Sequence, residues 1–205
     1  MAKFKLTKGE LKRQRDALQQ YERYLPTLQL KKQQLQLEIL RRNSLRQERA
    51  GYLAARKSAA GAWMGLLAEA ALDFRQVLSQ RSVITDTRNI AGVEVPAFKG
   101  VDFSLPEYDL FIAPLWVDQA LEFFKEMLAL QEEIKVIESS IAILRRELRI
   151  TSQRVNLFEK VKIPEAKEAI RLIKIYLGDQ MTNAVGRSKI AKRKIQAQEL
   201  VEVLV

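Results

Sequence analysis

Hydrophobic residues between positions 120 and 158 recur alternately every three and every four positions. This stripe holds for about five heptads, and the positions between its members are mostly charged. A period of about 3.5 residues predicts a helix that packs along another helix in a left-handed coiled coil. The members that we assign to the seam are Ile134, Ile137, Ile141, Leu144, Leu148, Val155 and Phe158.

The first part of the chain carries a matching stripe. Thr7, followed three residues later by Glu10, has the spacing of a capping box and predicts the start of a helix. The helical pattern continues to about Leu78, and at Pro26 we expect a kink or a locally lost hydrogen bond. The seam residues of this first helix are Leu11, Leu18, Leu25, Leu28, Leu35 and Ile39.

The C-terminal stripe slips out of register after Phe158 and resumes beyond Pro164 as Ala166, Ile170, Ile173 and Leu177. Proline inside a helix removes one hydrogen bond and bends the helix axis. We therefore expect a bend near Pro164, which is either a tolerated irregularity or a feature with a mechanical role.

The middle of the chain has a different period. Residues 89–96 are rich in β-branched side chains, and residues 101–105 alternate between apolar and polar. Turn-forming residues at 96–100 separate these runs, so the pattern predicts a short β-hairpin at about 89–105. Its members include Gly92, Val93, Val95 and Pro96. Because an isolated two-stranded hairpin is marginally stable, we expect it to pack on the helices or on a partner.

These patterns predict an all-α fold, in which the N- and C-terminal helices form a long antiparallel two-helix coiled coil. A small middle region would contain the hairpin. We divide the chain into an N-terminal coiled-coil helix at 1–60, a middle region at 61–118 and a C-terminal coiled-coil helix at 119–205, within one elongated domain.

Composition excludes many kinds of chemistry. The chain has no cysteine and no histidine, which excludes disulfides, Cys/His zinc sites and triads that need an imidazole. The acidic pairs Glu132–Glu133 and Glu165/Glu168 are predicted to lie on solvated faces of charged helices. We therefore predict no catalytic, metal-binding or cofactor-binding residue. The most apolar run, residues 62–72, is too short to span a bilayer, so we expect a soluble cytoplasmic protein.

Charge is distributed unevenly along a chain whose formal net charge is +10. Residues 1–57 carry 15 basic and 5 acidic side chains, residues 58–130 carry 5 and 10, and residues 131–205 carry 15 and 10. The basic run at 187–194 has three open interpretations: nucleic-acid binding through phosphates, contact with an acidic protein surface, or a solvated helix face. It contains no aromatic side chain on which bases could stack.

Four stretches resemble a known family. They are Leu-Thr-Lys-Gly-Glu-Leu at 6–11, the segment 24–35, Asn-Ile-Ala-Gly-Val-Glu-Val-Pro at 89–96, and Arg-Val-Asn-Leu-Phe-Glu-Lys at 154–160 followed by Ile163 and Pro164. On these residues the chain resembles the D subunit of the V-type (vacuolar/archaeal-type) rotary ATPases, particularly the bacterial branch. The signature residues are Arg154, Val155, Asn156, Glu159 and Pro164. The segment 24–33 departs from the commoner family pattern, which has glycine and further leucine and charged residues there.

The resemblance implies a non-catalytic central rotor stalk that couples ion flow through the membrane sector to ATP synthesis or hydrolysis. Its implied partners are the catalytic and regulatory ring subunits (A and B), the small stalk subunit (F) and a collar subunit that links to the membrane rotor ring. No cofactor, nucleic acid or membrane insertion is implied, and the protein would be cytoplasmic and peripheral to the membrane. The candidate ring contacts are Lys3, Lys5, Lys8, Lys12, Lys189, Lys192, Arg193 and Lys194. The main alternative is a basic coiled-coil protein that binds nucleic acid.

Overall fold

A computed structural model of the protein describes residues 5–61, 65, 81–104 and 116–203, the side chains of 198–203 excepted. The chain divides into two compact units. The first, which we call the hairpin unit, is Leu30–Thr151, and the second, the terminal unit, combines Met1–Gln29 with Ser152–Val205. Each unit is described by itself.

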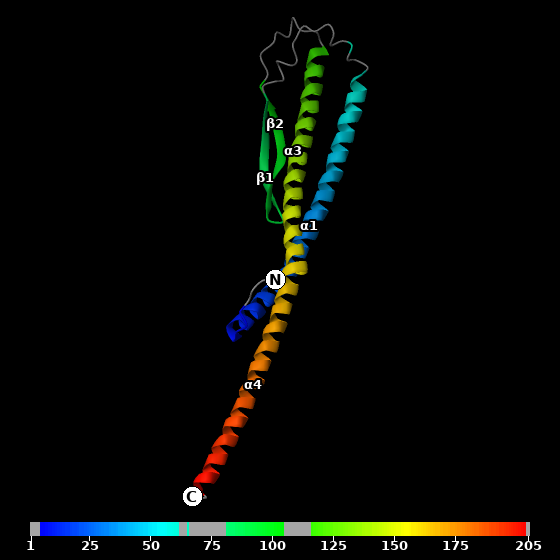
Figure 1. The fold of residues 1–205 in the computed structure, drawn as a ribbon. Helices are drawn as coiled ribbons and strands as arrows, with labels where there is room; N and C mark the ends of the chain where they lie inside the picture. The colour runs from blue at the N-terminus through cyan, green and yellow to red at the C-terminus, as the bar shows by residue number, and fades with distance from the viewer. Residues whose placement is uncertain (1–4, 62–64, 66–80, 105–115, 204–205) are drawn as a thin grey trace. The chain divides into compact units, whose positions relative to one another are not determined.

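Helix α1 spans Lys8–Ala60 and begins where the sequence predicts (Figure 1). The Thr7 side-chain oxygen accepts a hydrogen bond from the Glu10 backbone N–H at 3.3 Å, and the Thr7 carbonyl accepts one from the Leu11 N–H at 3.0 Å. These bonds satisfy N–H groups that a helix start otherwise leaves unpaired. The Glu10 carboxylate accepts a bond from the Gln14 side-chain amide at 2.8 Å.

The end of α1 differs from the sequence prediction. The helix continues through Pro26 but ends at Ala60, well before Leu78. Gly61 forms a turn in which its N–H donates to the Ser58 carbonyl at 3.2 Å. Residues 62–64 and 66–80, which include Leu78, lie outside the described residues.

The hairpin is present, but its turn was predicted in the wrong place. Strand β1 (Arg81–Ile90) pairs antiparallel with β2 (Val93–Phe103), and the chain reverses at Ala91 and Gly92. Both turn residues have positive φ, 51° and 77°. This is the requirement of a two-residue type I′ turn, whose twist matches that of the strands. The Gly92 N–H also donates to the Asn89 side-chain oxygen at 3.0 Å.

The stretch 96–100, which the sequence analysis placed in the turn, lies inside β2. Pro96 pairs with Thr87, and a two-stranded sheet tolerates this because each strand is an edge strand. Ile84 pairs with Gly100 and Thr85 pairs with Phe98, so Lys99 is the extra residue of a β-bulge. The proline and glycine of this stretch therefore occur at an edge and at a bulge.

The C-terminal part is helical from Trp116 to Val203 but contains one irregular turn. Helix α3 spans Trp116–Leu157, and α4 spans Ile163–Val203. Between them lies a π-helical turn, η2, at Phe158–Lys162. The Ile163 N–H donates to the Phe158 carbonyl, five residues back rather than four. A π turn accommodates one extra residue in a helix.

This π turn accounts for the slip in the heptad stripe. An uninterrupted three-four spacing from Val155 and Phe158 would continue at 162, 165, 169 and 172. The stripe that resumes at Ala166, Ile170 and Ile173 is displaced by one position. The π turn absorbs that one residue. Pro164 is the second residue of α4, where the proline lacks an N–H to donate.

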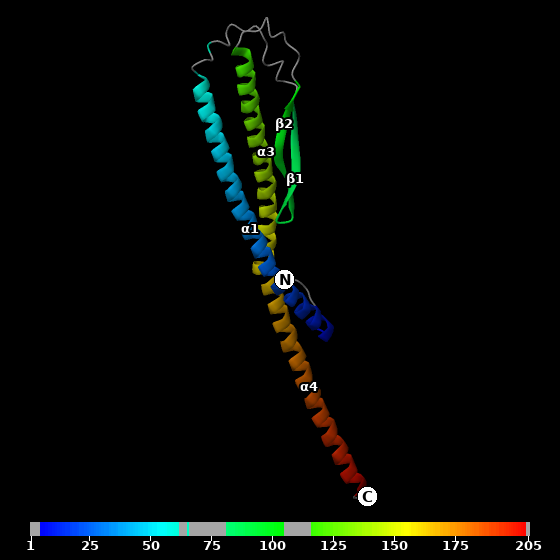
Figure 2. The same ribbon diagram turned by 180° about the vertical axis from the view of Figure 1, so that it is seen from behind.

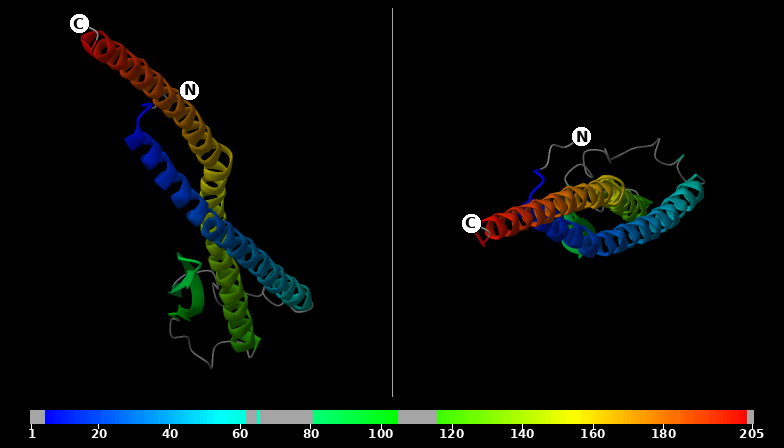
Figure 3. Two further views of the ribbon diagram at one scale, coloured as in Figure 1. Left: turned by 90° about the horizontal axis from the view of Figure 1, so that it is seen from below. Right: turned by 60° about the horizontal axis from the view of Figure 1, so that its bottom comes forward.

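The hairpin unit has a small hydrophobic core at which three elements meet. Leu35 and Ile39 of α1, Leu144 of α3 and Val95 of β2 are buried in one cluster, and Leu148 packs against it. Figure 2 and Figure 3 show the hairpin lying alongside α3. The hairpin therefore packs on the helices, as its marginal stability in isolation requires.

The terminal unit has a core of smaller side chains. Its buried residues include Val155 of α3 and four residues of α4, namely Ala166, Ala169, Ile170 and Ile173. Beyond Leu177, the described side chains of α4 up to residue 197 are exposed apart from the half-buried Gly186.

Candidate functional site: the helix pair and its charged surfaces

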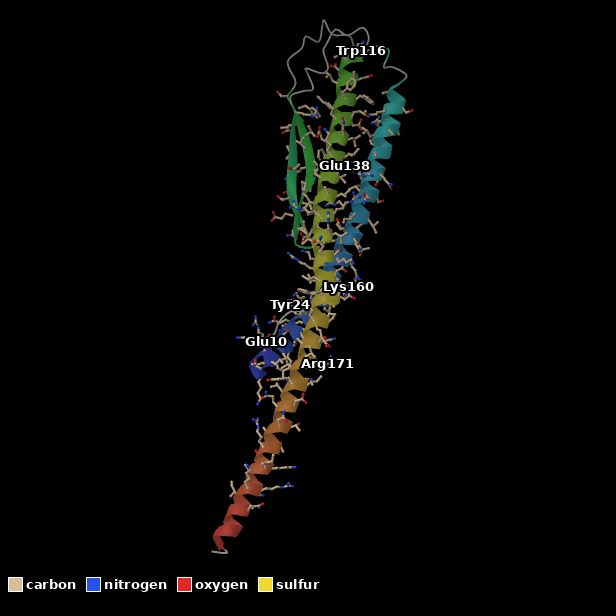
Figure 4. The ribbon with its side chains drawn as sticks, in the orientation of Figure 1. Glu10, Tyr24, Trp116, Glu138, Lys160 and Arg171 are labelled. Carbon is tan, nitrogen blue, oxygen red and sulfur yellow. The ribbon has the colours of Figure 1, made fainter. Side chains whose placement is uncertain are left out.

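Ion pairs join α1 to α3 along the hairpin unit. Their N···O distances lie between 2.9 and 3.2 Å. From one pair to the next, the α1 partner has a higher residue number and the α3 partner a lower one. The two helices therefore run antiparallel in this unit, as predicted. Figure 4 labels Glu138, one of the α3 members. The pairs are Lys31–Glu147, Arg46–Glu138, Arg49–Glu133 and Arg56–Glu126.

These ion pairs contribute alignment more than stability. An exposed pair is worth about 0–1 kcal/mol, and both partners of the Arg46–Glu138 pair are more than 40% exposed. Arg49 Nε lies 3.1 Å from Glu133 Oε1, but the geometry of this contact does not meet that of a hydrogen bond. Each charged residue has an oppositely charged partner at only one position along the facing helix. The series as a whole therefore opposes sliding of one helix along the other.

A polar contact also crosses the buried seam. Arg42 Nη1 donates to Ser140 Oγ at 3.2 Å, and Ser140 is fully buried. The same hydroxyl donates to the Ile137 carbonyl at 2.7 Å. A buried hydroxyl with both partners satisfied costs little and fixes the relative height of the two helices.

The outer end of this series is a three-residue cluster. Glu126 accepts hydrogen bonds from Arg56 at 3.0 Å and from the Tyr52 hydroxyl at 3.2 Å. The Arg56 guanidinium also lies 5.7 Å from the Tyr52 ring centroid, a cation–π distance. The hydrogen bond to Glu126, followed by that to Tyr52, raises the pKa of Arg56 above its ordinary value.

Glu132 corrects the expectation that the paired glutamates face solvent. Its carboxylate accepts hydrogen bonds from Lys135 Nζ and Arg81 Nη2, each at 2.9 Å, and the residue is 8% exposed. The Lys135 bond lowers the pKa of Glu132, burial opposes this, and the Arg81 bond adds to the lowering. Since Arg81 begins β1, this contact anchors the open end of the hairpin to α3.

The terminal unit has fewer interhelical contacts. Lys167 of α4 pairs with Glu22 of α1 at 3.2 Å, and the Tyr21 and Phe158 rings lie 5.2 Å apart between centroids. The bidentate pair Arg171–Glu168 lies within α4, and it lowers the pKa of Glu168. Figure 4 labels Arg171 on α4 and Lys160 in the π turn.

The predicted seam residues are all buried or half-buried. On α1, Leu35 and Ile39 are buried and the others are half-buried, namely Leu11, Leu18, Leu25 and Leu28. On α3, the buried members are Ile137, Ile141, Leu144 and Val155. Ile134, Leu148 and, in the π turn, Phe158 are half-buried. The structure brings Leu35, Ile39, Leu144 and Leu148 together, and the role of the full set as a coiled-coil seam stays a prediction.

The other predicted residues differ in their exposure. Of the signature residues, Val155 is buried, whereas Arg154, Asn156, Glu159 and Pro164 are exposed. In the hairpin, Val95 is buried, Val93 and Pro96 are half-buried, and Gly92 is exposed in the turn. The described candidate ring contacts are all exposed, namely Lys5, Lys8, Lys12, Lys189, Lys192, Arg193 and Lys194. Lys3 lies outside the described residues.

The interhelical charge partners could not be predicted from the sequence, and neither could an exposed apolar face of α1 that includes Leu30, Leu37 and Leu40. The available signal for the partners was the opposite charge of residues that flank the two seams, such as Arg46 and Glu138.

Within the described part of the chain, no group of three or more acidic, cysteine or histidine side chains could hold a metal ion. None of the helices described is long and apolar enough to cross a bilayer.

Comparison with known proteins points to one family. The family model described as the D subunit of ATP synthase matches residues 10–193. A V-type ATP synthase D subunit of Borreliella burgdorferi is 44% identical over 196 residues, which cover 95% of this chain and 96% of that protein. The corresponding protein of Chlamydia trachomatis serovar L2 is 35% identical over 197 residues, covering 95% and 97%. That of Chlamydia pneumoniae is 33% identical over 197 residues, covering 95% and 94%.

Proposed function

The chain belongs to the family of ATP synthase D subunits, and on that premise we propose that it is the central rotor stalk of a V-type ATP synthase. In this role it couples ion flow through the membrane sector to ATP synthesis or hydrolysis in the catalytic ring. The stalk supplies no catalytic group of its own, and it is peripheral to the membrane on the cytoplasmic side.

The observation that carries this proposal is the antiparallel pairing of α1 and α3. A stalk must pass on torque, so its two helices have to resist sliding and twisting against each other. The interhelical ion pairs from Lys31–Glu147 to Arg56–Glu126, together with the Arg42–Ser140 hydrogen bond, supply that resistance along the hairpin unit. Each contact is weak alone, and a series in fixed register resists collectively.

The exposed basic side chains near the end of α4 support contact with acidic surfaces of the catalytic ring. Lys189, Lys192, Arg193 and Lys194 are exposed, and the structure gives no ion pair for them among the described residues. Long-range attraction to acidic ring surfaces would centre this segment and would be weakened by salt. A rotating stalk must release each contact as it turns, and exposed pairs worth about 0–1 kcal/mol permit that.

The hairpin unit suits different partners. We assign it to the small stalk subunit and to the collar subunit, and the terminal unit to the catalytic and regulatory ring subunits. The hairpin is anchored at both ends, by Val95 in the core and by the Arg81–Glu132 pair, and so offers a fixed surface. Nucleic acid is not a partner in this assignment.

Truncation tests the assignment directly. A chain that ends at Arg187 loses the basic segment of α4 and keeps the hairpin unit intact. We expect it to pull down the small stalk subunit as the full chain does and to lose most of its binding to the catalytic ring. A truncated chain that keeps the ring and loses the small stalk subunit would show that the assignment of the two units is reversed.

A further inference from the structure

Strand β1 of the hairpin presents an exposed edge. Every residue of β1 except Ile90 is exposed, and its apolar side chains Val83 and Ile84 are 38% and 41% exposed. Because the sheet has only two strands, one side of β1 has no strand beside it. Proline and bulged residues often protect such edges from pairing, but β1 contains no proline, and the extra residue of the bulge lies in β2. The edge is therefore suited to pairing with a further strand.

The helices cover β2 and leave β1 largely uncovered. Directly paired residues project from the same face of a sheet, so Asp86 lies on the face of Ala97, and Arg88 lies on the face of Val95. This face packs on the helices, because Val95 belongs to the buried core. Asp86 and Arg88 are nevertheless exposed, whereas Ala97 is half-buried. A strand added beside β1 would therefore extend the sheet away from the helices that cover β2.

The backbone of β1 shows which residues can bond to a further strand. Thr87 pairs with Pro96, which has no N–H, and the Thr87 N–H donates to the Asp86 side chain at 2.8 Å. Thr87 therefore directs its backbone groups away from β2. Because this direction alternates along a strand of an antiparallel ladder, Thr85 and Asn89 do the same. These three residues carry the hydrogen-bonding groups of the open edge.

The sequence around Thr87 is complementary to itself in an antiparallel arrangement. When Thr87 lies opposite Thr87 of a second copy, Asp86 lies opposite Arg88 of that copy. Ile84 then lies opposite Ile90. Threonine pairs, opposite charges and β-branched pairs all stabilise facing strands. The charged and apolar pairs fall at the non-hydrogen-bonded positions, where facing side chains are closest.

Charge selects this register over its neighbours. Outward-directed residues must face one another, so the centre of the pairing can move only from one residue to the next along β1. A centre at Asp86 or at Arg88 places two like charges directly opposite each other, which is destabilising. A centre at Thr85 or at Asn89 leaves both charges opposite uncharged residues. Of these registers, only the one centred on Thr87 pairs both charges.

We propose that two copies of the chain pair through β1 into a symmetric dimer with a four-stranded antiparallel sheet centred on Thr87, in which Asp86 of each copy faces Arg88 of the other. The contact uses the same surface on both copies and is therefore closed. The outer strands of the sheet are the two β2 strands, which pack on the helices of their own copies. Because a single strand pair is a small interface, the dimer should be weak and depend on concentration. The proposal concerns the chain outside the complex and goes beyond the proposed function.

Exchanging the two charges tests the dimer. The isolated full-length chain is studied by sedimentation equilibrium from about 1 μM to about 1 mM, a range that covers weak association. Arg88→Asp and Asp86→Arg each place like charges opposite each other, so each should raise the dissociation constant about tenfold or more. The double variant Asp86→Arg/Arg88→Asp should restore dimerisation. Lys99→Asp is the matched control: it makes the same change in charge at an exposed position of β2 and should have little effect.

Disulfide formation tests the register, because the chain has no cysteine of its own. Thr87→Cys would face its own copy at a Cα–Cα distance of about 5.5 Å, which a disulfide can span. Thr85→Cys is the matched control, because its copy would lie four residues away, about 13 Å along the strand. Under a mild oxidant, the Thr87→Cys chain should form covalent dimers about tenfold faster or more.

Several outcomes would overturn the proposal. A chain that stays monomeric up to about 1 mM would exclude the dimer. Dimerisation that resists Arg88→Asp, or that the double variant fails to restore, would place the contact on another surface. Equal rates of disulfide formation at positions 85 and 87 would contradict the register. None of these results bears on the rotor role, because all are measured on the isolated chain.

Discussion

The hairpin unit and the terminal unit use the same heptad pattern but stabilise it differently. In the hairpin unit, large side chains such as Leu35 and Leu144 are fully buried, and several ion pairs connect the helices. In the terminal unit, the buried residues include two small ones, Ala166 and Ala169. Its described interhelical contacts are one exposed ion pair, Lys167–Glu22, and one aromatic contact.

This difference shows that a periodic stripe determines which face of a helix is buried. It does not determine how strongly one helix is held at a given position along the other. Leucine and isoleucine knobs fit one set of holes, and opposite charges meet at one height. Alanine permits close approach with little preference for height. The specific alignment of the two helices is therefore concentrated in the hairpin unit. The terminal unit leaves apolar and basic side chains such as Met181 and Lys192 exposed.

Single-residue deletions in the C-terminal helices should have the largest effect on the packing of the helices. Deleting Arg146 rotates every later seam position of α3 by about 100° relative to α1. Most of the shifted positions belong to the terminal unit, so we expect loss of the cooperative thermal transition of that unit. Deleting Lys160 together with Pro164→Ala removes the extra residue of the π turn and leaves the stripes on either side aligned. This second variant should retain its helical circular dichroism and a cooperative transition; collapse of both variants alike would contradict the one-residue account of η2.

A buried charge should have the next largest effect. Ile141 is 4% exposed, so Ile141→Asp places an unpaired carboxylate in the seam. We expect a loss of about 3–5 kcal/mol in the free energy of unfolding, measured by denaturant titration. Arg146→Asp on the exposed face should cost less than about 1 kcal/mol. Equal costs for the two variants would show that the seam has been assigned to the wrong face.

The hairpin turn should respond more modestly. Gly92→Val places a β-branched residue at φ +77°, which we expect to cost about 1–3 kcal/mol. Gly100→Ala is the control, because Gly100 lacks positive φ and an added Cβ there meets no atom within 4 Å. Hydrogen exchange of the strand amides should accelerate in the first variant and stay near the original rates in the second. Equal protection in both would place the turn elsewhere.

Acid should weaken the anchoring of the hairpin through Glu132. The pKa of this carboxyl is lowered in the folded protein, so its contribution to stability is complete above the ordinary value of 4.5 and is lost as pH falls through the lowered value. The difference in unfolding free energy between the original chain and Glu132→Gln should be constant from neutral pH to about pH 5 and shrink below it. A difference that grows on acidification would reverse the sign of this contribution.

The smallest effect should come from single basic residues near the end of α4. Replacing any one of Lys189, Lys192, Arg193 or Lys194 by Ala should change the ring affinity by less than about 1 kcal/mol. ATPase activity of the reassembled complex should therefore stay near that of the original. Reversing all four to Glu should weaken assembly, and added salt should not restore it fully. A single alanine variant that abolishes activity would replace the idea of many weak contacts by one specific contact.

Much of the fold could be predicted from the sequence because helix burial follows a simple period. The stripes through Leu35 and Leu144, the start of α1 after Thr7 and the presence of a hairpin are all local patterns. The turn could not be placed, because Ala91 adopts a positive φ that alanine seldom takes, while Pro96 and Gly100 mimic turn signals inside an edge strand. The slip after Phe158 was visible, but only the structure identifies it as a π turn.

The candidate surfaces were predictable to a lesser degree. Exposure of Lys189 and its neighbours follows from their charge and is seen in the structure, whereas their contact with the ring stays a prediction. Glu132 was misjudged, because its burial depends on Arg81, 51 residues away, and no local pattern carries that information. The exposed apolar face of α1 around Leu37 was missed because a stripe that mixes leucine with glutamine resembles an ordinary helix face.

Observation of rotation tests the central claim most directly. Lys99 is exposed in the β-bulge, so Lys99→Cys gives a unique attachment point on the hairpin of a chain without cysteine. With the catalytic ring fixed to a surface and a gold nanorod attached at this thiol, addition of ATP should produce unidirectional stepwise rotation that stops when ATP is removed. A nanorod that stays still while the same complexes hydrolyse ATP at their normal rate would show that this chain is not the rotor.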